Sequence, residues 1–414
     1  MCGRWALFCH LFEIKARCPL HPLFNRRFAI LWIVLLLSGV SSSAVIPLFP
    51  AYVEGELGRS PLFAANLRMM FFLLGGLAAI PAGVVCDSLG RKLTLVLGTT
   101  GAVTAGLLFV AHSPAALWAL CLYSGLTSGV QATGSHTYLM GSVAKSHFGI
   151  GTAIFFIGHN LGNALGSRAA GLVAKSHGYT TMGQSLAVLA LLAVLCTLAF
   201  LPSIPLHGET ARGNIWRLQG FRRLLSRREI RLLLGIRFFP TFCWGSMSFA
   251  VPLILARLSD YDPRVPATYQ TLYLVSAMCF QIVTGRLCDR FGRRWPLIIS
   301  SVAIPLSVLA LAASAKSVTA FYVFGITNAS VAWSLSTIIP GLVNDCSQEE
   351  EKGQLMSLTH FCWSLGMATG TLMAGAVIGW GATMVFIISA AAASIPATAV
   401  VIRLSGNRQS SPAE

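Results

Sequence analysis

Ten residues, Gly83-Val-Val-Cys-Asp-Ser-Leu-Gly-Arg-Lys92, decide the fold of this chain because they occur twice. The second copy, Gly285-Arg-Leu-Cys-Asp-Arg-Phe-Gly-Arg-Arg294, lies 202 residues later and is identical at five of the ten positions. Further matches lie at an offset of 204, where Gly149, Leu161-Gly162, Gly166 and Gly171 correspond to Gly353, Leu365-Gly366, Gly370 and Gly375. Independent matches at nearly one spacing indicate an internal duplication.

The chain around these copies is too apolar for a soluble protein, because 55% of its 414 residues are hydrophobic and only 11% are charged. The apolar residues form stretches of about 20, each long enough to cross a bilayer as a helix. Continuously apolar runs such as Leu186–Phe200 lack the alternation of a membrane β-barrel. We predict an all-α membrane protein with twelve transmembrane helices, at 28–52, 62–86, 93–111, 115–139, 148–174, 180–203, 228–257, 265–288, 294–315, 318–343, 353–378 and 380–404.

The net charge of +16 is explained by basic residues on one side of the membrane, and it does not indicate nucleic-acid binding. With a cytoplasmic N-terminus, 22 of the 30 Lys and Arg residues fall on the inner side, five lie outside and three lie within spans. This is the distribution of the positive-inside rule. The sequence therefore predicts an integral protein of the cell (inner) membrane with both termini in the cytoplasm.

The duplication divides the chain into two pseudo-symmetric six-helix bundles. We expect an N-terminal tail at 1–27, bundles at 28–203 and 228–404, a basic cytoplasmic linker at 204–227 and a C-terminal tail at 405–414. Because each repeat has an even number of helices, both halves share one orientation about an axis along the membrane normal. A central cavity between them follows from that arrangement.

The duplicated G-x-x-x-D-x-x-G-R-[KR] segment resembles the signature loop of the major facilitator superfamily, between helices 2 and 3 and again between helices 8 and 9. The resemblance implies a conformational gate built from Gly83, Asp87, Gly90, Arg91, Lys92, Gly285, Asp289, Gly292, Arg293 and Arg294. Each carboxylate can accept hydrogen bonds from a neighbouring helix N-terminus or Arg, while the first glycine of each copy lets another helix approach closely. The charges would also serve as plain topology anchors, but the paired Asp favours the gate.

The first copy departs from the family pattern, since Ser88 stands where the second copy has the usual Arg, Arg290. The first latch is therefore expected to be the weaker one. In helix 1, Pro47 and Pro50 resemble helix 1 of exporters in the superfamily. Both prolines remove backbone donors, so neighbours or a cavity must satisfy the freed carbonyls. Kinked packing and contact with a solute both remain open.

Polar and aromatic side chains within spans are candidates for the cavity wall, because they are costly in lipid unless they face a partner or water. They comprise Gln131, His159, Asn160, Asn163, Gln281, Asn328, Trp333, His360 and Trp363. Neighbouring Gly158, Gly162 and Gly166, and their counterparts Gly366 and Gly370, form ridges suited to close helix packing. Arg68 lies near the outer edge of helix 2, and we expect it to pair with Glu54 or Glu56.

The leading hypothesis is a secondary transporter that moves a small organic solute by alternating access, most similar to the drug and sugar exporters of the superfamily. The alternatives are a facilitator without proton coupling and a non-transporting membrane sensor. No P-loop, HExxH or G-x-S-x-G motif supports an enzyme, and the cysteines suggest neither zinc nor disulfides, so we expect no metal or other cofactor. We expect a monomer.

Proton coupling would need an unusual carrier in this chain. No Asp or Glu lies deep in any predicted span, and helix 4 has no Arg in the stretch Tyr123–Gly129, where proton antiporters of the superfamily carry an R-x-x-Q-G motif. Histidine is the remaining side chain that exchanges protons near neutrality. The candidates are His159, His360 and His136, and the alternative is that all three are neutral packing residues.

Overall fold

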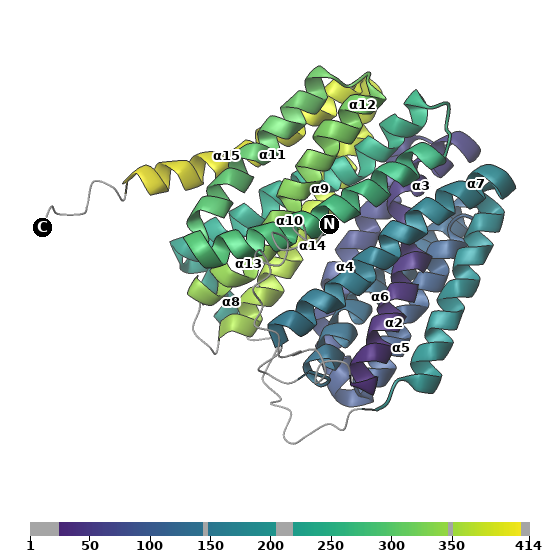
Figure 1. Ribbon diagram of the computed structural model, residues 1–414, viewed down its shortest axis with the longest axis horizontal. Helices are drawn as coiled ribbons and strands as arrows, with labels where there is room; N and C mark the ends of the chain where they lie inside the picture. Colours follow the sequence, from purple (N-terminus) through teal and green to yellow (C-terminus); the bar gives the residue numbers. More distant parts are fainter. Residues whose placement is uncertain (1–24, 144–147, 204–217, 347–350, 407–414) are drawn as a thin grey trace, which may run out of the picture.

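The computed structural model describes residues 25–143, 148–203, 218–346 and 351–406, and within these ranges the chain forms helices joined by short turns (Figure 1). The first half contains α2 (Arg26–Ser42), α3 (Val45–Ala51), the π-helical η1 (Tyr52–Glu56), α4 (Pro61–Leu89), α5 (Arg91–Leu107), α6 (Pro114–Met140) and α7 (Phe148–Phe200). A short helix, α8 (Leu218–Ser226), precedes the second half. That half contains α9 (Arg228–Leu258), α10 (Arg264–Phe291), α11 (Arg294–Ala313), α12 (Val318–Ala320), η3 (Phe321–Gly325), α13 (Ile326–Cys346), α14 (Lys352–Val377), η5 (Ile378–Trp380) and α15 (Ala382–Gly406).

The predicted all-α fold with twelve spans is confirmed, and the observed helix boundaries lie within a few residues of the expected ones. The element α7 comprises two helices, which correspond to the fifth and the sixth span. The two helices meet at Gly178, whose φ of 82° is a conformation that a residue with a Cβ adopts only with strain. The described residues include eight segments that are by themselves long and apolar enough to cross a membrane.

The first span is interrupted at residues 43–44, between α2 and α3, and its two prolines lie within α3. Pro47 has no N–H to donate to the carbonyl of Ser43, one turn earlier. The hydroxyl of Ser167 in α7 donates to that carbonyl instead, at 3.0 Å. The expectation that a neighbouring helix satisfies the freed group is thus confirmed at this position.

The glycine ridges pack as the sequence predicts. A side chain at Gly162 or Gly166 would collide with the backbone of α2 at Leu36 or Val40. In the second half, side chains at Gly366 and Gly370 would collide with α9 near Phe238 and Phe242. The first and fifth helices of each repeat therefore approach closely through the same glycine positions, which preserves the duplication in three dimensions.

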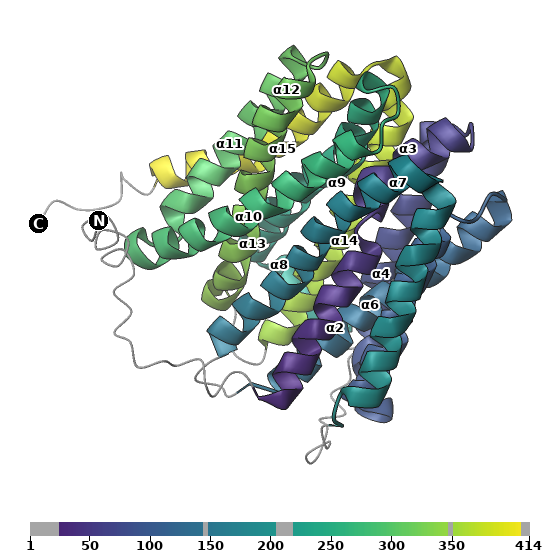
Figure 2. The same ribbon diagram turned by 45° about the vertical axis from the view of Figure 1, so that its right-hand side comes forward.

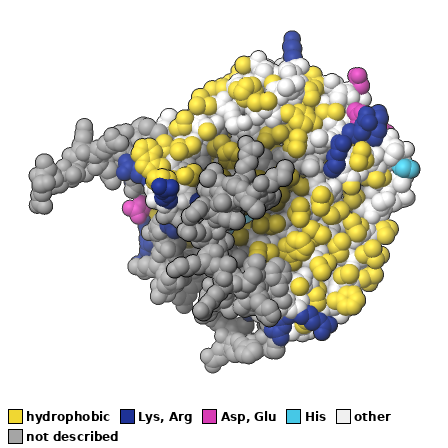
Figure 3. All heavy atoms as spheres, in the orientation of Figure 1, with side chains coloured by type: hydrophobic (Ala, Val, Ile, Leu, Met, Phe, Trp, Pro, Cys, Tyr) yellow, Lys and Arg dark blue, Asp and Glu magenta, His cyan; other side chains and the backbone are white. Residues whose placement is uncertain are grey.

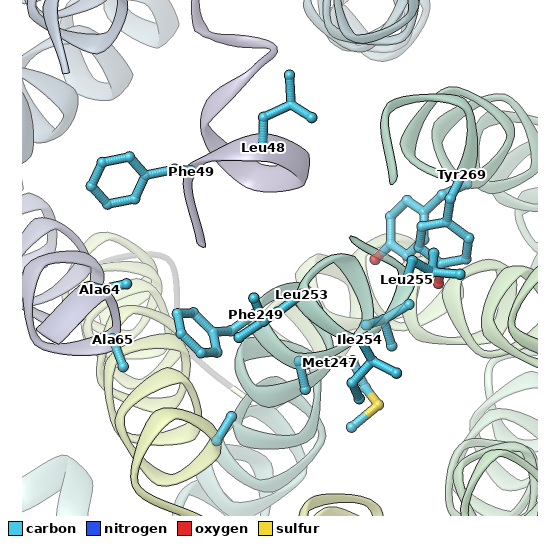
Figure 4. Packing of buried hydrophobic residues seen from close by; sticks show 14 of the residues in the cluster. Leu48, Phe49, Ala64, Ala65, Met247, Phe249, Leu253, Ile254, Leu255 and Tyr269 are labelled. Atoms are coloured by element: carbon cyan, nitrogen blue, oxygen red, sulfur yellow. The ribbon is translucent and has the colours of Figure 1, made fainter. Parts of the chain in front are cut away.

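The two halves lie side by side, with α4 next to α14, α7 next to α10 and α3 next to α9 (Figures 1 and 2). One buried cluster joins Phe49 of α3 and Ala65 of α4 to Phe249 and Leu253 of α9, so the apolar core is continuous across the boundary (Figure 4). Hydrophobic side chains also cover much of the outer face seen in Figure 3, with charged ones mainly toward its margins. Such a surface suits contact with lipid.

Candidate functional site

The molecule has two ends, which the contacts between the halves distinguish. We call the end where α2 and α9 begin the linker end, and the end where α4 and α10 begin the contact end. At the contact end a side chain at Gly171 of α7 would collide with Ala267 of α10. Its repeat counterpart Gly375 of α14 would collide with Ala65 of α4 in the same way. Two symmetric glycine contacts thus hold the halves together at this end.

A polar cluster also joins the halves at the contact end. The guanidinium of Arg257 donates two hydrogen bonds to the carboxylate of Glu54, at 2.6 and 3.0 Å, and Tyr261 donates a third at 3.0 Å. Because Glu54 belongs to the first half and the other two to the second, this cluster bridges the boundary. Bidentate arginine pairs of this kind are geometrically specific.

A second ionic cluster lies beside the first. Asp262 of the second half lies 2.6 Å from the guanidinium of Arg264 and 3.7 Å from the ammonium of Lys175, which belongs to the first half. Hydrogen bonding from Arg264 lowers the pKa of the Asp262 carboxyl to about 2. This carboxylate therefore stays ionised at any physiological pH, and the contact between Asp262 and Lys175 joins opposite charges.

The pairing expected for Arg68 is wrong. Its guanidinium donates to the carbonyl and hydroxyl of Ser248 in α9, at 3.0 and 3.4 Å, and lies over the rings of Phe72 and Phe249. Glu54 is engaged by Arg257 instead. Arg68 lies two turns after the start of α4. At this depth its neighbour is α9 of the other half, and not η1, which contains Glu54 and Glu56.

The duplicated motif lies at the linker end, where the close glycine contacts of the contact end are not repeated. Outside the glycine's own stretch of helix, no atom of the described residues lies within 4 Å of a Cβ built on Gly83 or Gly285. Gly90 and Gly292 end their helices with φ of 86° and 74°, which confirms the tight turns. Arg293 donates to the carbonyl of Gly341 at 2.9 Å. The side chains of Asp87 and Asp289 lie outside the described residues, so their latching role stays a prediction.

A cavity of about 50 Å³ lies between the two ends, against the boundary of the halves. Its wall comes mostly from the second half, with Ile46 of α3 as the contribution of the first. Of the predicted residues, Asn328 and Trp333 line it. The wall also includes Trp244, Ser248, Tyr269, Gln270, Tyr273 and Met367. Ile46 lies beside the prolines of the first span, so this broken helix does reach the cavity.

Aromatic rings extend from this cavity across the boundary. Trp244 contacts Trp333 and Trp363, with centroids 5.0 and 6.0 Å apart, and Trp363 contacts Phe72 of the first half at 6.2 Å. His360 stacks on Trp363 at 5.5 Å. The predicted residues His360 and Trp363 therefore adjoin the cavity without lining it.

The remaining candidates are not brought to this cavity. Gln131 donates to the hydroxyl of Ser38 in α2 at 2.7 Å, and Asn163 lies 3.1 Å from the ring of His159 within α7. Asn160 is buried within the first half, and Gln281 is half-buried on α10. None of these residues lines the cavity described above, and their contact with a solute stays a prediction.

Comparison with known proteins identifies the family. A sequence model of the Major Facilitator Superfamily matches residues 31–278 and 233–413, which together cover most of the chain. The chain belongs to the Major Facilitator Superfamily. It is therefore an integral membrane protein and a secondary transporter of small molecules, and not an enzyme.

Its relatives within the Major Facilitator Superfamily are distant. A multi-drug resistance efflux pump PmrA homolog of Lactococcus lactis is 24% identical over 372 residues, covering 86% of this chain and 89% of the relative. The multidrug resistance protein MdtG of a Rahnella species is 23% identical over 384 residues, covering 89% and 90%. A crystal structure of a POT family transporter superposes with a TM-score of 0.76 at 13% identity, covering 91% of this chain and 96% of that one. This superposition shows the shared superfamily fold.

Sequence reasoning missed the cavity residues Trp244, Gln270 and Tyr273. Tyr269 and Tyr273 are four residues apart and so share one face of α10, with Gln270 next to that face. Such a polar and aromatic face was a usable signal. Trp244 carried no comparable signal, because a single tryptophan in an apolar span fits lipid contact equally well.

Proposed function

We propose that this protein exports an amphipathic organic solute by alternating access between its two bundles, 28–203 and 228–404. One observation carries the proposal: the halves meet at the contact end through Gly171 and Gly375, while the motif glycines Gly83 and Gly285 at the linker end make no close contact with the described residues of another helix. A rocking motion that closes the linker end would bring helices onto Gly83 and Gly285 and separate the contact-end pair. The conformation described here is one of these two states.

We assign the linker end to the cytoplasm of a cell with a single or inner membrane, so that both chain ends and the linker 204–227 are cytoplasmic. The basic residues supply the support, because they concentrate in segments at this end. A membrane-impermeant thiol reagent applied to intact cells should not label a cysteine introduced into the linker, whereas it should label one at Arg59. Labelling of the linker from outside would reverse the topology.

Export of an organic solute is supported by the cavity and by the relatives. Four aromatic side chains, Trp244, Tyr269, Tyr273 and Trp333, surround the cavity, which favours a solute with an apolar body. One of the two relatives described above is named a multi-drug resistance efflux pump, and the other a multidrug resistance protein. A volume of about 50 Å³ is too small for such a solute, so binding requires the bundles to separate further. We expect the protein to act as a monomer.

Time-resolved flux in proteoliposomes tests this function. Purified protein should move at least one solute of a broad organic panel faster than protein-free liposomes do, and inside-out membrane vesicles should accumulate it. A protein that binds members of the panel but moves none is a sensor and contradicts the proposal. Accumulation only in right-side-out vesicles would retain transport and reverse its direction.

A further inference from the structure

The wall of the cavity holds buried hydrogen-bond donors without a well-formed acceptor. The indole N–H of Trp333 and the hydroxyl of Tyr273 are buried, and neither makes a hydrogen bond of normal geometry with the described residues. The hydroxyl has only the indole groups of Trp333 and Trp244 beside it, and these can donate to it but cannot accept its proton. Both residues line the cavity. An indole N–H can only donate. A buried polar group without a partner is unfavourable, so the site is best completed by a ligand that brings acceptor oxygens.

A buried cation lies directly behind this wall. Arg68 is 3% exposed, and it donates to Ser248, which itself lines the cavity. Its other neighbours are the rings of Phe72 and Phe249. No carboxylate of the described residues lies within 4.0 Å of its guanidinium. The positive charge of Arg68 is therefore not neutralised by this part of the chain.

A second cation lies on the linker-end side. Arg237 and Trp244 line a smaller neighbouring cavity, and the Nε of Arg237 is buried without a partner among the described residues. Trp244 belongs to both cavities. The acidic residues of the chain lie toward the ends of the predicted spans or beyond them, with none at mid-depth. Each of the two cavities thus has a buried guanidinium at or behind its wall, and no acidic residue lies at this depth.

We propose that the transported solute is an organic anion, an aromatic or apolar body bearing a carboxylate. The carboxylate accepts from Trp333 and Tyr273 in the positive field of Arg68, and the rings of Trp244 and Trp333 hold the apolar body. Arg237 provides the next cation toward the linker end. Gln270 and Asn328 carry both donors and acceptors, so they do not discriminate between charges. This inference rests on the proposed transport function.

Matched probes test the charge preference directly. Three probes share one apolar body and differ in charge: naphthoate, naphthamide and naphthylmethylammonium. Their affinities are compared by the thermal stabilisation that each gives to the purified protein. Naphthoate should bind with a Kd lower than that of the amide or the amine by about tenfold. Equal or tighter binding of the amine, which the aromatic rings alone would attract, overturns the proposal. So does a failure of naphthoate to bind.

Variants test which side chains cause the preference for the anionic probe. Arg68→Gln should weaken naphthoate binding by about tenfold and leave naphthamide binding within about twofold. Tyr273→Phe keeps the ring and Trp333→Phe keeps a smaller aromatic ring, and each removes one donor, so they test the same site if Arg68→Gln does not fold. Arg59→Gln, which removes an exposed arginine, is the matched control and should bind like the unaltered protein. An unchanged naphthoate preference in all three cavity variants overturns the assignment.

Flux measurements separate this inference from the function on which it depends. If proteoliposomes move the amine and not naphthoate, the protein is a transporter and the anion assignment fails. If naphthoate binds in an Arg68-dependent way but no probe or other solute moves, the site is correctly assigned and the transport function fails. Arg68-dependent flux of naphthoate supports both.

Discussion

At the scale of single residues, two glycines set how closely the halves approach. Gly171 and Gly375 occupy equivalent positions of the two repeats, and each has a helix of the other half against it. Neither has a positive φ, so the need for glycine is one of space and not of backbone conformation. A larger side chain would therefore act on closure of the contact end alone.

We expect Gly171→Val and Gly375→Val to favour the state that is open at the contact end. Overpacking a close contact costs about 1–3 kcal/mol, which shifts a two-state equilibrium by roughly fivefold or more. The check is the rate at which an impermeant thiol reagent labels a cysteine placed at Ser248. Gly235→Val is the control, because no described atom lies within 4 Å of a Cβ there. Equal labelling rates in all three variants would contradict the packing argument.

The two motif carboxylates give the second prediction at this scale. Asp87→Asn and Asp289→Asn should each lower turnover more than solute affinity, because they change the balance of the two states and leave the cavity intact. Asp289→Asn should have the larger effect, since the second copy has Arg290 where the first has Ser88. Flux and equilibrium binding, measured on the same preparations, test this prediction. Unchanged turnover in both variants would contradict the latching role of the two carboxylates.

At the scale of elements, the sequence predicts the helices and the breaks between them well, and their partners across the two halves poorly. Length and apolarity gave the twelve spans, and the duplication gave the glycine ridges between α2 and α7 and between α9 and α14. The break expected between residues 174 and 180 is also present, at the non-helical Gly178 inside α7. The partner of Arg68 was missed because Ser248 of α9 lies 180 residues away in the sequence, and only the packing of the halves brings them together.

The candidate site was predicted unevenly for a related reason. Polarity within a span identified Asn328, Trp333, His360 and Trp363 at or beside the cavity. The same criterion selected Gln131 and His159, whose contacts lie within the first half. A polar residue in a span must find a partner, but the sequence does not say whether that partner is a solute or another helix.

The Glu54–Arg257 pair joins two elements of different halves, and its loss should loosen the contact end. Glu54→Gln should increase thiol labelling of a cysteine at Ser248 several-fold, since the pair and the Tyr261 bond are worth about 1 kcal/mol or more. The exchanged double variant, Glu54→Arg with Arg257→Glu, should restore slow labelling. The control is Glu351→Gln, which removes a comparable pair with Arg227 inside one half. Fast labelling in that control would mean that general loosening explains the effect.

At the scale of the whole molecule, coupling to protons depends on which groups titrate. The pKa of Asp262 is about 2, below its usual value near 3.9, so its contribution to closure is complete above pH 4 and is lost only as the pH falls through about 2. The contact end should therefore close equally at pH 5 and pH 7. Thiol labelling at Ser248 should be the same at the two values after correction for reagent reactivity.

If a pH gradient drives flux, we propose that His159 or His360 carries the proton. No carboxylate lies at mid-depth in the predicted spans, and imidazole is the group that exchanges protons near neutrality. The double variant His159→Gln and His360→Gln should then lose concentrative transport in proteoliposomes and keep downhill flux. Concentrative transport that survives in the double variant would place the proton elsewhere. A protein that never concentrates the solute is a facilitator.

The central claim is that the halves must separate at the contact end for the solute to cross. The direct measurement is flux through a cross-linked variant. Its native cysteines are replaced, and Glu54→Cys and Arg257→Cys introduce two new ones. A short bifunctional methanethiosulfonate then joins these two cysteines. Cysteines at Arg227 and Glu351, joined in the same way inside one half, serve as the control. We predict that the first cross-link reduces flux to that of protein-free liposomes, that reduction restores it, and that the control transports normally. Undiminished flux through the protein cross-linked at the contact end would contradict the account.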